Sequence, residues 1–317
     1  MYFKYILTGL LSVCSFQAEA GPFAYITNQG SDNVSIIDLE KNKVVATIPV
    51  GHRPAGIAVS HDGLRAYVSN PESQEISVID TKNHVLIRNV PVGDGPVGIA
   101  VSPDGHNIFI ADWYRHAVFV MDSEKLNIIS AIPVGESPSG IAVAPDGSQL
   151  YVANRDDNNL KVINFLKKEI VATIPVGKAP FGVTVSLSGE QVFVANVQSN
   201  DVSIIDTKTQ TIITSIIVGH APYAIAYEAA RNRIFVTNQS DSSVSVIDLN
   251  DYKVIATIAV GEYPEGIAAH PSGKYVYVAT WFDGIVSVID TETLSVIEEI
   301  KAGEGSRAFG EFISRQP

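Results

Sequence analysis

The sequence predicts an all-β protein, a seven-bladed β-propeller with four antiparallel strands in each blade. A pattern of residues recurs seven times at a spacing of 42 residues, without insertion or deletion. Each copy contains four short segments rich in Val, Ile and Tyr, separated by Gly, Asp and Asn turns, which is typical of strands. Four short strands in a period of about 40 residues is the pattern of a propeller blade.

Three columns of the repeat show how regular it is. The first is a glycine that ends an apolar run: Gly51, Gly93, Gly135, Gly177, Gly219, Gly261 and Gly303. The second is the mostly acidic residue that closes the preceding apolar run: Asp38, Asp80, Asp122, Asn164, Asp206, Asp248 and Asp290. The third is mostly asparagine: Asn28, Asn70, Asp112, Asn154, Asn196, Asn238 and Thr280. Because the first column is glycine in every copy, we expect a turn with φ > 0 there. A second glycine column, at position 56, is alanine at Ala224 and Ala308, which indicates a close approach of strands near the axis.

The second unit shows the order of elements within one copy. The strands are expected at 56–60, 65–69, 76–80 and 85–92, with a tight turn at 61–63, a polar loop at 70–75 and a turn at 82–83. A helical solenoid is the alternative at this period, but no segment repeats apolar residues at spacings of three and four. Strands such as 34–37 are apolar on both faces, which fits a blade sandwiched between two neighbours.

The two ends of the repeat region predict how the ring closes. The first strand of the first blade is missing, since the region begins with a second strand at 23–27. A matching first strand occurs at 308–313. We therefore expect closure by pairing of the N- and C-terminal segments, which removes the free edges of the sheet.

The first 20 residues have the features of a signal peptide. Lys4 precedes an apolar stretch, and Ala18 and Ala20 have the small-x-small pattern of a cleavage site. We expect cleavage after Ala20, with residues 21–317 forming the propeller and a periplasmic or secreted location. Cys14 is the single cysteine and lies in this segment, so no disulfide is expected in the mature chain. Lipidation of Cys14 is an alternative, although Val13 is larger than the residue usually found before a lipidated cysteine.

Several motifs show a resemblance to a known family. Tyr67-Val-Ser-Asn70, Tyr151-Val-Ala-Asn154, Phe193-Val-Ala-Asn196 and Phe235-Val-Thr-Asn238 are variants of one tetrapeptide. The units resemble the YVTN-repeat β-propellers, and the chain is similar to the exported YncE-like bacterial group. The resemblance covers about 23–313. It implies a β-propeller without one fixed function, since such proteins include surface proteins and subunits of periplasmic dehydrogenases, and one YncE-like protein has been linked to single-stranded DNA.

Composition and motifs disfavour several functions. The chain has 22 Lys and Arg against 34 Asp and Glu, a net charge of −12, which disfavours nonspecific binding to nucleic acid. It contains no Gly-x-Ser-x-Gly, His-Glu-x-x-His or phosphate-loop motif, so the sequence favours a protein that is not an enzyme. We expect no cofactor. His52 and His220 are weak candidates for a metal site, since they share one column four repeats apart; the alternative is a solvated rim.

The loops between second and third strands contain the most unusual residues. Most copies have small polar residues there, but two have Trp113-Tyr114-Arg115-His116 and Trp281-Phe282, which include both tryptophans. These aromatic side chains either pack on neighbouring loops or form a contact surface. A second variable column lies at the expected channel mouth. In it Phe181 and Tyr223 fall on adjacent blades and are expected to form an aromatic wall, while Glu265 and Arg307 are expected to pair.

These residues lead to one main hypothesis and two alternatives. The main hypothesis is an exported, noncatalytic binding or scaffold propeller that presents an aromatic and charged face around the channel mouth. Its partner is an unknown protein or small molecule, and we expect a monomer with no membrane span. One alternative is an accessory subunit of, or partner for, a periplasmic quinoprotein-type dehydrogenase. The other is single-stranded DNA binding, with the aromatic rings stacking on bases and Arg53, Arg115, Arg155 and Arg307 at phosphates.

Overall fold

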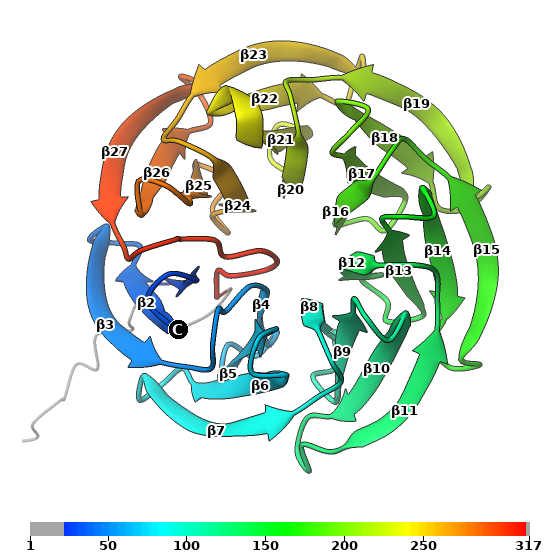
Figure 1. The fold of residues 1–317 in the computed structure, drawn as a ribbon. Coiled ribbons are helices and arrows are strands. Elements are labelled where there is room, and N and C mark those ends of the chain that lie inside the picture. The colour runs from blue at the N-terminus through cyan, green and yellow to red at the C-terminus, as the bar shows by residue number, and fades with distance from the viewer. Residues whose placement is uncertain (1–21, 315–317) are drawn as a thin grey trace, which may run out of the picture.

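The computed structural model describes residues 22–314, which form a ring of seven antiparallel sheets around a central axis (Figure 1). Six of these sheets have four strands and one has three. The prediction of a seven-bladed propeller is therefore confirmed. The expected signal peptide, residues 1–20, and Cys14 within it lie outside the described residues.

In each four-stranded blade the chain runs from the innermost strand to the outermost one. The strands are β4 (Ile57–Val59), β5 (Arg65–Asn70), β6 (Glu75–Asp80) and β7 (Val85–Pro91); β8 (Pro96–Val101), β9 (Asn107–Asp112), β10 (Ala117–Asp122) and β11 (Ile128–Pro133); β12 (Pro138–Val143), β13 (Gln149–Asn154), β14 (Asn159–Asn164) and β15 (Glu169–Pro175); β16 (Pro180–Val185), β17 (Gln191–Asn196), β18 (Asp201–Asp206) and β19 (Thr211–Ile217); β20 (Pro222–Glu228), β21 (Arg233–Asn238), β22 (Ser243–Asp248) and β23 (Lys253–Ala259); and β24 (Pro264–Ala269), β25 (Tyr275–Thr280), β26 (Ile285–Asp290) and β27 (Ser295–Lys301). A short 3-10 helix, η1 (Gln239–Asp241), follows β21.

The remaining blade contains both ends of the described chain. Its strands β1 (Phe23–Asn28), β2 (Asn33–Asp38) and β3 (Lys43–Pro49) are joined on the axial side by the C-terminal segment 306–314. The Tyr25 N–H donates to the Phe312 carbonyl at 2.9 Å, and the Arg307 N–H donates to the Thr27 carbonyl at 2.8 Å. The expected closure by pairing of the two terminal segments is confirmed.

The closing segment is less regular than the sequence predicts. Instead of a continuous strand at 308–313, it makes isolated bridges to β1 and to the neighbouring blade. Its backbone leaves the extended region at Ala308 (φ 48°) and at Gly310 (φ 121°). These turns let the Phe309 carbonyl accept a hydrogen bond from the Ile57 N–H at 2.8 Å, so the segment links two blades.

Large side chains of the second strands fill the space between blades. Tyr25, Tyr67, Phe109, Phe193 and Phe235 are fully buried and occupy equivalent positions. The outermost strands are different, since most of their side chains are exposed or half-buried. The core is therefore a set of layers between adjacent blades, which explains why the inner strands are apolar on both faces.

Different contacts explain why glycine occurs in each of the two glycine columns. Of the seven glycines that follow the fourth strands, only Gly93 has a positive φ, so the predicted turn with φ > 0 is wrong for the column as a whole. A Cβ at Gly51 would instead lie 2.7 Å from Cγ of the buried Asn70. In the other column, a Cβ at Gly140 would lie 2.1 Å from the Phe181 carbonyl of the next inner strand, as the expected close approach requires.

Candidate functional site

The ring has two faces, which we name by the loops that form them. The connection face contains the blade-to-blade connections and the loops between second and third strands. The turn face contains the turns between first and second strands. A cavity of about 320 Å³ opens on the connection face, and one of about 470 Å³ opens on the turn face.

A buried aspartate positions the connection-face loop with the first tryptophan. Asp112 occupies the mostly asparagine column and is fully buried. Its Oδ1 accepts hydrogen bonds from the Tyr114 and Arg115 N–H groups at 3.1 and 2.9 Å, and its Oδ2 accepts from the Asp94 and Gly95 N–H groups at 2.7 and 3.1 Å. An asparagine side chain has one carbonyl oxygen, so the carboxylate gives this blade additional acceptor capacity for holding two loops together.

The structure brings together four of the residues predicted to bind a ligand. Trp113, Tyr114, Phe181 and Arg307 line the connection-face cavity, together with Arg53 and other residues. The Trp113 and Phe181 rings are tilted toward each other with centroids 6.3 Å apart. Tyr114 leaves 68% of its surface exposed, so it forms part of the rim.

The aromatic rings at the axis pack as a cluster. Phe181 and Tyr223 are stacked with centroids 4.2 Å apart, which confirms the predicted aromatic wall. Phe309 of the closing segment packs on both rings, at 4.9 Å and 5.7 Å. Phe181 lines the connection-face cavity and Phe309 lines the turn-face cavity. The cluster therefore separates the two cavities.

The predicted ion pair lies beside this cluster and is buried. Nε of Arg307 lies 2.8 Å from Oε2 of Glu265, and their side chains are only 17% and 7% exposed. The Gln239 amide donates to Oε1 of Glu265 at 2.9 Å, and the Arg307 guanidinium donates to the Tyr223 hydroxyl. Burial raises the pKa of Glu265, although the Arg307 charge acts in the opposite direction. Burial also raises the pKa of Tyr223, so the hydroxyl stays neutral.

The other predicted residues lie elsewhere on the connection face. Arg115 Nε lies 2.6 Å from Oδ2 of Asp94, and His116 Nδ1 accepts from the Ser137 N–H at 3.2 Å. Both side chains connect neighbouring loops. Trp281 and Phe282 form a second aromatic group, in which their ring centroids are 4.8 Å apart.

The second aromatic group is anchored to the first blade. The Trp281 indole N–H donates to the Gln29 side-chain oxygen at 3.1 Å, and Tyr263 packs edge-on against both rings of the group. Phe282 remains 63% exposed. Both alternatives for these loops therefore occur, because the tryptophans pack against neighbours while Tyr114 and Phe282 face solvent.

The two histidines considered for a metal site bind carboxylates instead. His52 Nδ1 lies 3.0 Å from Asp32 Oδ2, and His220 Nδ1 lies 2.8 Å from Asp241 Oδ1. All four side chains lie on the rim of the connection face. Within residues 22–314, no three His, Cys, Asp or Glu side chains gather as a metal site.

The arginines considered for phosphate binding are all paired with carboxylates. Besides Arg115 and Arg307, Arg53 lies 3.0 Å from Glu72 and Arg155 lies 2.8 Å from Asp156. Arg155 also lies over the Trp113 ring at 5.8 Å. The connection face therefore has little uncompensated positive charge at these positions.

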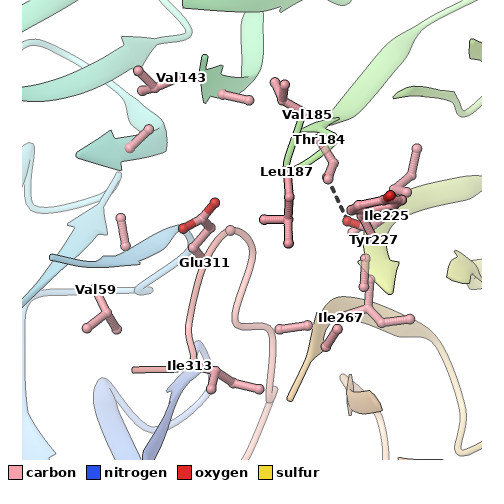
Figure 2. A pocket seen from close by; sticks show the side chains of 18 of the residues that line it. Val59, Val143, Thr184, Val185, Leu187, Ile225, Tyr227, Ile267, Glu311 and Ile313 are labelled. Atoms are coloured by element: carbon pink, nitrogen blue, oxygen red, sulfur yellow. Dashed lines mark hydrogen bonds between the residues drawn. The ribbon is translucent and has the colours of Figure 1, made fainter. Parts of the chain in front are cut away.

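Sequence reasoning missed the larger cavity, on the turn face. It lies among the C-terminal ends of the innermost strands and the closing segment (Figure 2). Its wall follows the inner-strand column Val59, Val101, Val143, Val185, Tyr227, Ala269 and Glu311. The departures from small apolar residues at Tyr227 and Glu311 are the sequence signal that marks this cavity. No helix among the described residues is long and apolar enough to cross a membrane.

These features define the class of protein: a seven-bladed β-propeller closed by its own ends, with an aromatic cluster between a connection-face and a turn-face cavity. The family described as the cytochrome D1 heme domain matches residues 23–144 and 191–308, more than half of the chain. The chain belongs to this family. A second family, described as lactonase, 7-bladed beta-propeller, matches residues 120–213. No curated protein matches significantly.

Similar solved structures agree with the fold. Hydrazine synthase of Kuenenia stuttgartiensis is 22% identical with a TM-score of 0.77, and the match covers 91% of this chain and 99% of that one. A functionally unknown protein of Desulfotomaculum acetoxidans is 16% identical with a TM-score of 0.79, covering 90% and 98%. The dihydro-heme d1 dehydrogenase NirN in complex with DHE is 20% identical with a TM-score of 0.70, covering 92% and 66%. Identities this low show the fold alone.

The family description implies a haem, whose iron takes an axial ligand and whose anionic carboxylate groups are favoured by nearby Lys or Arg. His61 and His270 line the turn-face cavity, but the charged residues of its wall are Glu228 and Glu311, without Lys or Arg. The connection-face cavity has Arg53 and Arg307, each already paired with a carboxylate, and no histidine. The side chains at these two cavities therefore do not fit a haem.

Proposed function

We propose that the protein is an exported, noncatalytic binding or scaffold propeller of the YVTN-repeat, YncE-like type, whose connection face binds a ligand or partner. The observation behind this proposal is the connection-face cavity of about 320 Å³ with an exposed aromatic residue, Tyr114, at its rim. Cavities lined by aromatic side chains with a few polar groups are typical of binding sites. The Tyr67-Val-Ser-Asn70 motif and its variants support the YVTN assignment.

The exposed aromatic side chains favour a partner over a ligand that is fully enclosed. Tyr114 and Phe282 belong to separate loops and together leave two large rings in contact with solvent. Each ring is attached to an ordered loop, since Asp112 holds one and Trp281 packs on the other. Rigid aromatic side chains of this kind give contact area at low entropic cost and are enriched among binding hot spots.

An accessory role beside a redox enzyme is the second candidate, because the chain belongs to a family described by a haem domain. In this role the propeller contributes a binding surface while the partner supplies the redox chemistry. Single-stranded DNA binding is less favoured, since the arginines proposed for phosphates are paired with Glu72, Asp94, Asp156 and Glu265.

Site-specific photocrosslinking tests this proposal. A photoreactive phenylalanine analogue is placed at Tyr114, at Phe282 or, as a control, at the exposed Val171 of β15 on the circumference. Periplasmic extract of the source cells is then added to each purified protein. We expect a discrete crosslinked partner from positions 114 and 282 and none from 171. Mass spectrometry of the partner distinguishes a dehydrogenase or cytochrome subunit from other proteins.

Two outcomes would contradict the proposal. Crosslinking that is equally strong at position 171 would mean that the connection face is not selective. A steeply salt-dependent affinity for a dT12 oligonucleotide, lost in Trp113→Ala, would favour the DNA alternative. The exported location is supported by the signal-like residues 1–20, and it requires that the protein recovered from the periplasm start near Gly21.

A further inference from the structure

The repeat allows the surroundings of the two tryptophans on the connection face to be compared position by position. Trp113 and Trp281 are four repeats apart, so each neighbour of one has an equivalent beside the other. We call the surroundings of Trp113 the first sector and those of Trp281 the second sector. In both sectors the residue after the tryptophan is an exposed aromatic one, Tyr114 or Phe282. The two sectors differ in their charged residues.

The first sector supplies its own positive charge. Arg155 is the next residue in the column of Trp113, and its guanidinium carbon lies 5.8 Å from the centre of the Trp113 ring. Arg115 lies two residues after the tryptophan, with its Nε 2.6 Å from Oδ2 of Asp94. A cation over an aromatic face is favourable, and an ion pair between two loops neutralises both of its members. The aromatic ring and the carboxylate of the first sector therefore already have cations beside them.

The second sector has acidic or neutral residues at the same positions. Because the ring is closed, the next residue in the column of Trp281 is Gln29 of the first blade, whose neutral side chain accepts the indole hydrogen bond. The two positions that form the ion pair of the first sector are both acidic here, as Glu262 and Asp283. The Glu262 N–H donates to the Asp283 carboxylate, so the two acidic residues lie on adjoining loops.

A third acidic residue belongs to the second sector. Glu304 occupies the column of Glu262 one repeat later, and its carbonyl accepts a hydrogen bond from the Gly30 N–H at 2.9 Å, beside the residue that holds the indole. Glu262, Asp283 and Glu304 are all exposed. Within residues 22–314, no Lys, Arg or His forms an ion pair with any of the three. The second sector therefore combines an exposed aromatic ring with negative charge that the described chain does not neutralise.

This combination favours a positively charged occupant. Phe282 is 63% exposed, and the Tyr263 ring packs edge-on against it with centroids 5.3 Å apart, so the exposed ring is held in place. The guanidinium of arginine stacks on aromatic faces and donates N–H groups to carboxylates. Complementary charge across an interface also increases the rate of association and selects the partner.

We propose that the second sector binds an arginine side chain of a basic segment of the partner protein. The guanidinium lies on the Phe282 ring, and its N–H groups donate to the carboxylates of Glu262 and Glu304. This inference rests on the proposed function, since it names the chemistry of the partner that the connection face binds. It assigns the two aromatic loops different roles, because the first sector has arginines of its own.

Fluorescence titration with two matched peptides tests the inference. The protein carries Trp113→Phe, so that its tryptophan emission comes from Trp281 alone. The probes are acetyl-Gly-Arg-Gly-Arg-Gly-amide and the same peptide with citrulline in place of arginine, which keeps the shape of the side chain and removes its charge. We expect a saturable change of Trp281 emission with the arginine peptide. The citrulline peptide should bind about tenfold more weakly or worse, because its hydrogen bonds to the carboxylates are not charge-assisted.

Substitutions separate the second sector from the general acidity of the chain. Glu262→Gln combined with Glu304→Gln should remove most of the preference for arginine over citrulline, and Phe282→Ala should weaken binding of the arginine peptide. Glu136→Gln is the matched control, because Glu136 is an exposed acid in the column of Glu262, three repeats away. It should leave the preference unchanged.

The inference is wrong if the arginine peptide does not saturate, if the citrulline peptide binds as tightly, or if Glu136→Gln weakens binding as much as the double substitution. Any of these results, together with a partner crosslinked from positions 114 and 282, would overturn this inference and leave the proposed function intact. Absence of a crosslinked partner would instead contradict the proposed function, whatever the peptides show.

Discussion

Removing Arg307 should destabilise the ring because it leaves a buried carboxylate without its partner. Nε of Arg307 lies 2.8 Å from Oε2 of Glu265, and the two side chains are almost excluded from solvent. Without the arginine, Glu265 retains the hydrogen bond from Gln239 but no opposite charge. Loss of one member of a buried ion pair costs about 3–5 kcal/mol. We expect Arg307→Ala to lower the free energy of unfolding by about this amount at pH 7.

The cost should depend on pH, and its sign follows from the pKa of Glu265. Burial raises this pKa above its ordinary value of 4.5, so the folded protein binds more protons than the unfolded chain between the two pKa values. Stability therefore falls as the pH rises through this interval. Arg307→Ala removes the charge that lowers the pKa, so the fall should extend to higher pH. Below pH 4.5 the carboxyl is mostly protonated in both states, so the variant should lose less stability there.

Urea denaturation followed by circular dichroism at pH 4 and pH 7 measures both effects. Arg53→Ala is the matched control, because Arg53 and Glu72 are 3.0 Å apart but 48% and 62% exposed, and such pairs contribute less than about 1 kcal/mol. The double variant Glu265→Gln, Arg307→Met should recover most of the stability. If Arg307→Ala costs no more than Arg53→Ala, or costs the same at both pH values, then the pair is not desolvated and the reasoning fails.

Two further predictions concern the packing of the ring. Gly140→Ala should lower the free energy of unfolding by about 1–3 kcal/mol, because its Cβ would overlap the Phe181 carbonyl. Ala224→Gly in the same column should lower it by about 1 kcal/mol or less. Urea denaturation midpoints compare the two variants, and equal losses would contradict the close approach of adjacent inner strands. Deleting residues 307–317 removes the hydrogen bonds that the closing segment makes to Tyr25 and Ile57. The cooperative unfolding transition followed by circular dichroism should therefore be lost. An unchanged transition would show that the ring does not need this segment for its stability.

Much of this protein follows from the sequence because a strict repeat assigns every residue an equivalent position. The 42-residue period predicts the number of blades, the order of strands within each and the sharing of one blade by both ends. It also predicts that Phe181 adjoins Tyr223 and that Glu265 adjoins Arg307, since both pairs are one period apart. These relations need only the spacing of residues along the chain.

The distance from the axis and the depth of burial required the tertiary structure. The packing of seven blades determines how far apart the inner strands lie, so it alone shows that the Glu265–Arg307 pair is buried. It also shows that the repeat glycines make room for asparagine side chains. The irregular backbone of the expected final strand at Ala308 likewise appears only in the tertiary structure. The turn-face cavity depends on side chains from every blade. The volume of this cavity is set by the sizes of the side chains that all the blades direct toward the axis. Knowing which residues occupy equivalent positions in the repeat does not give this volume.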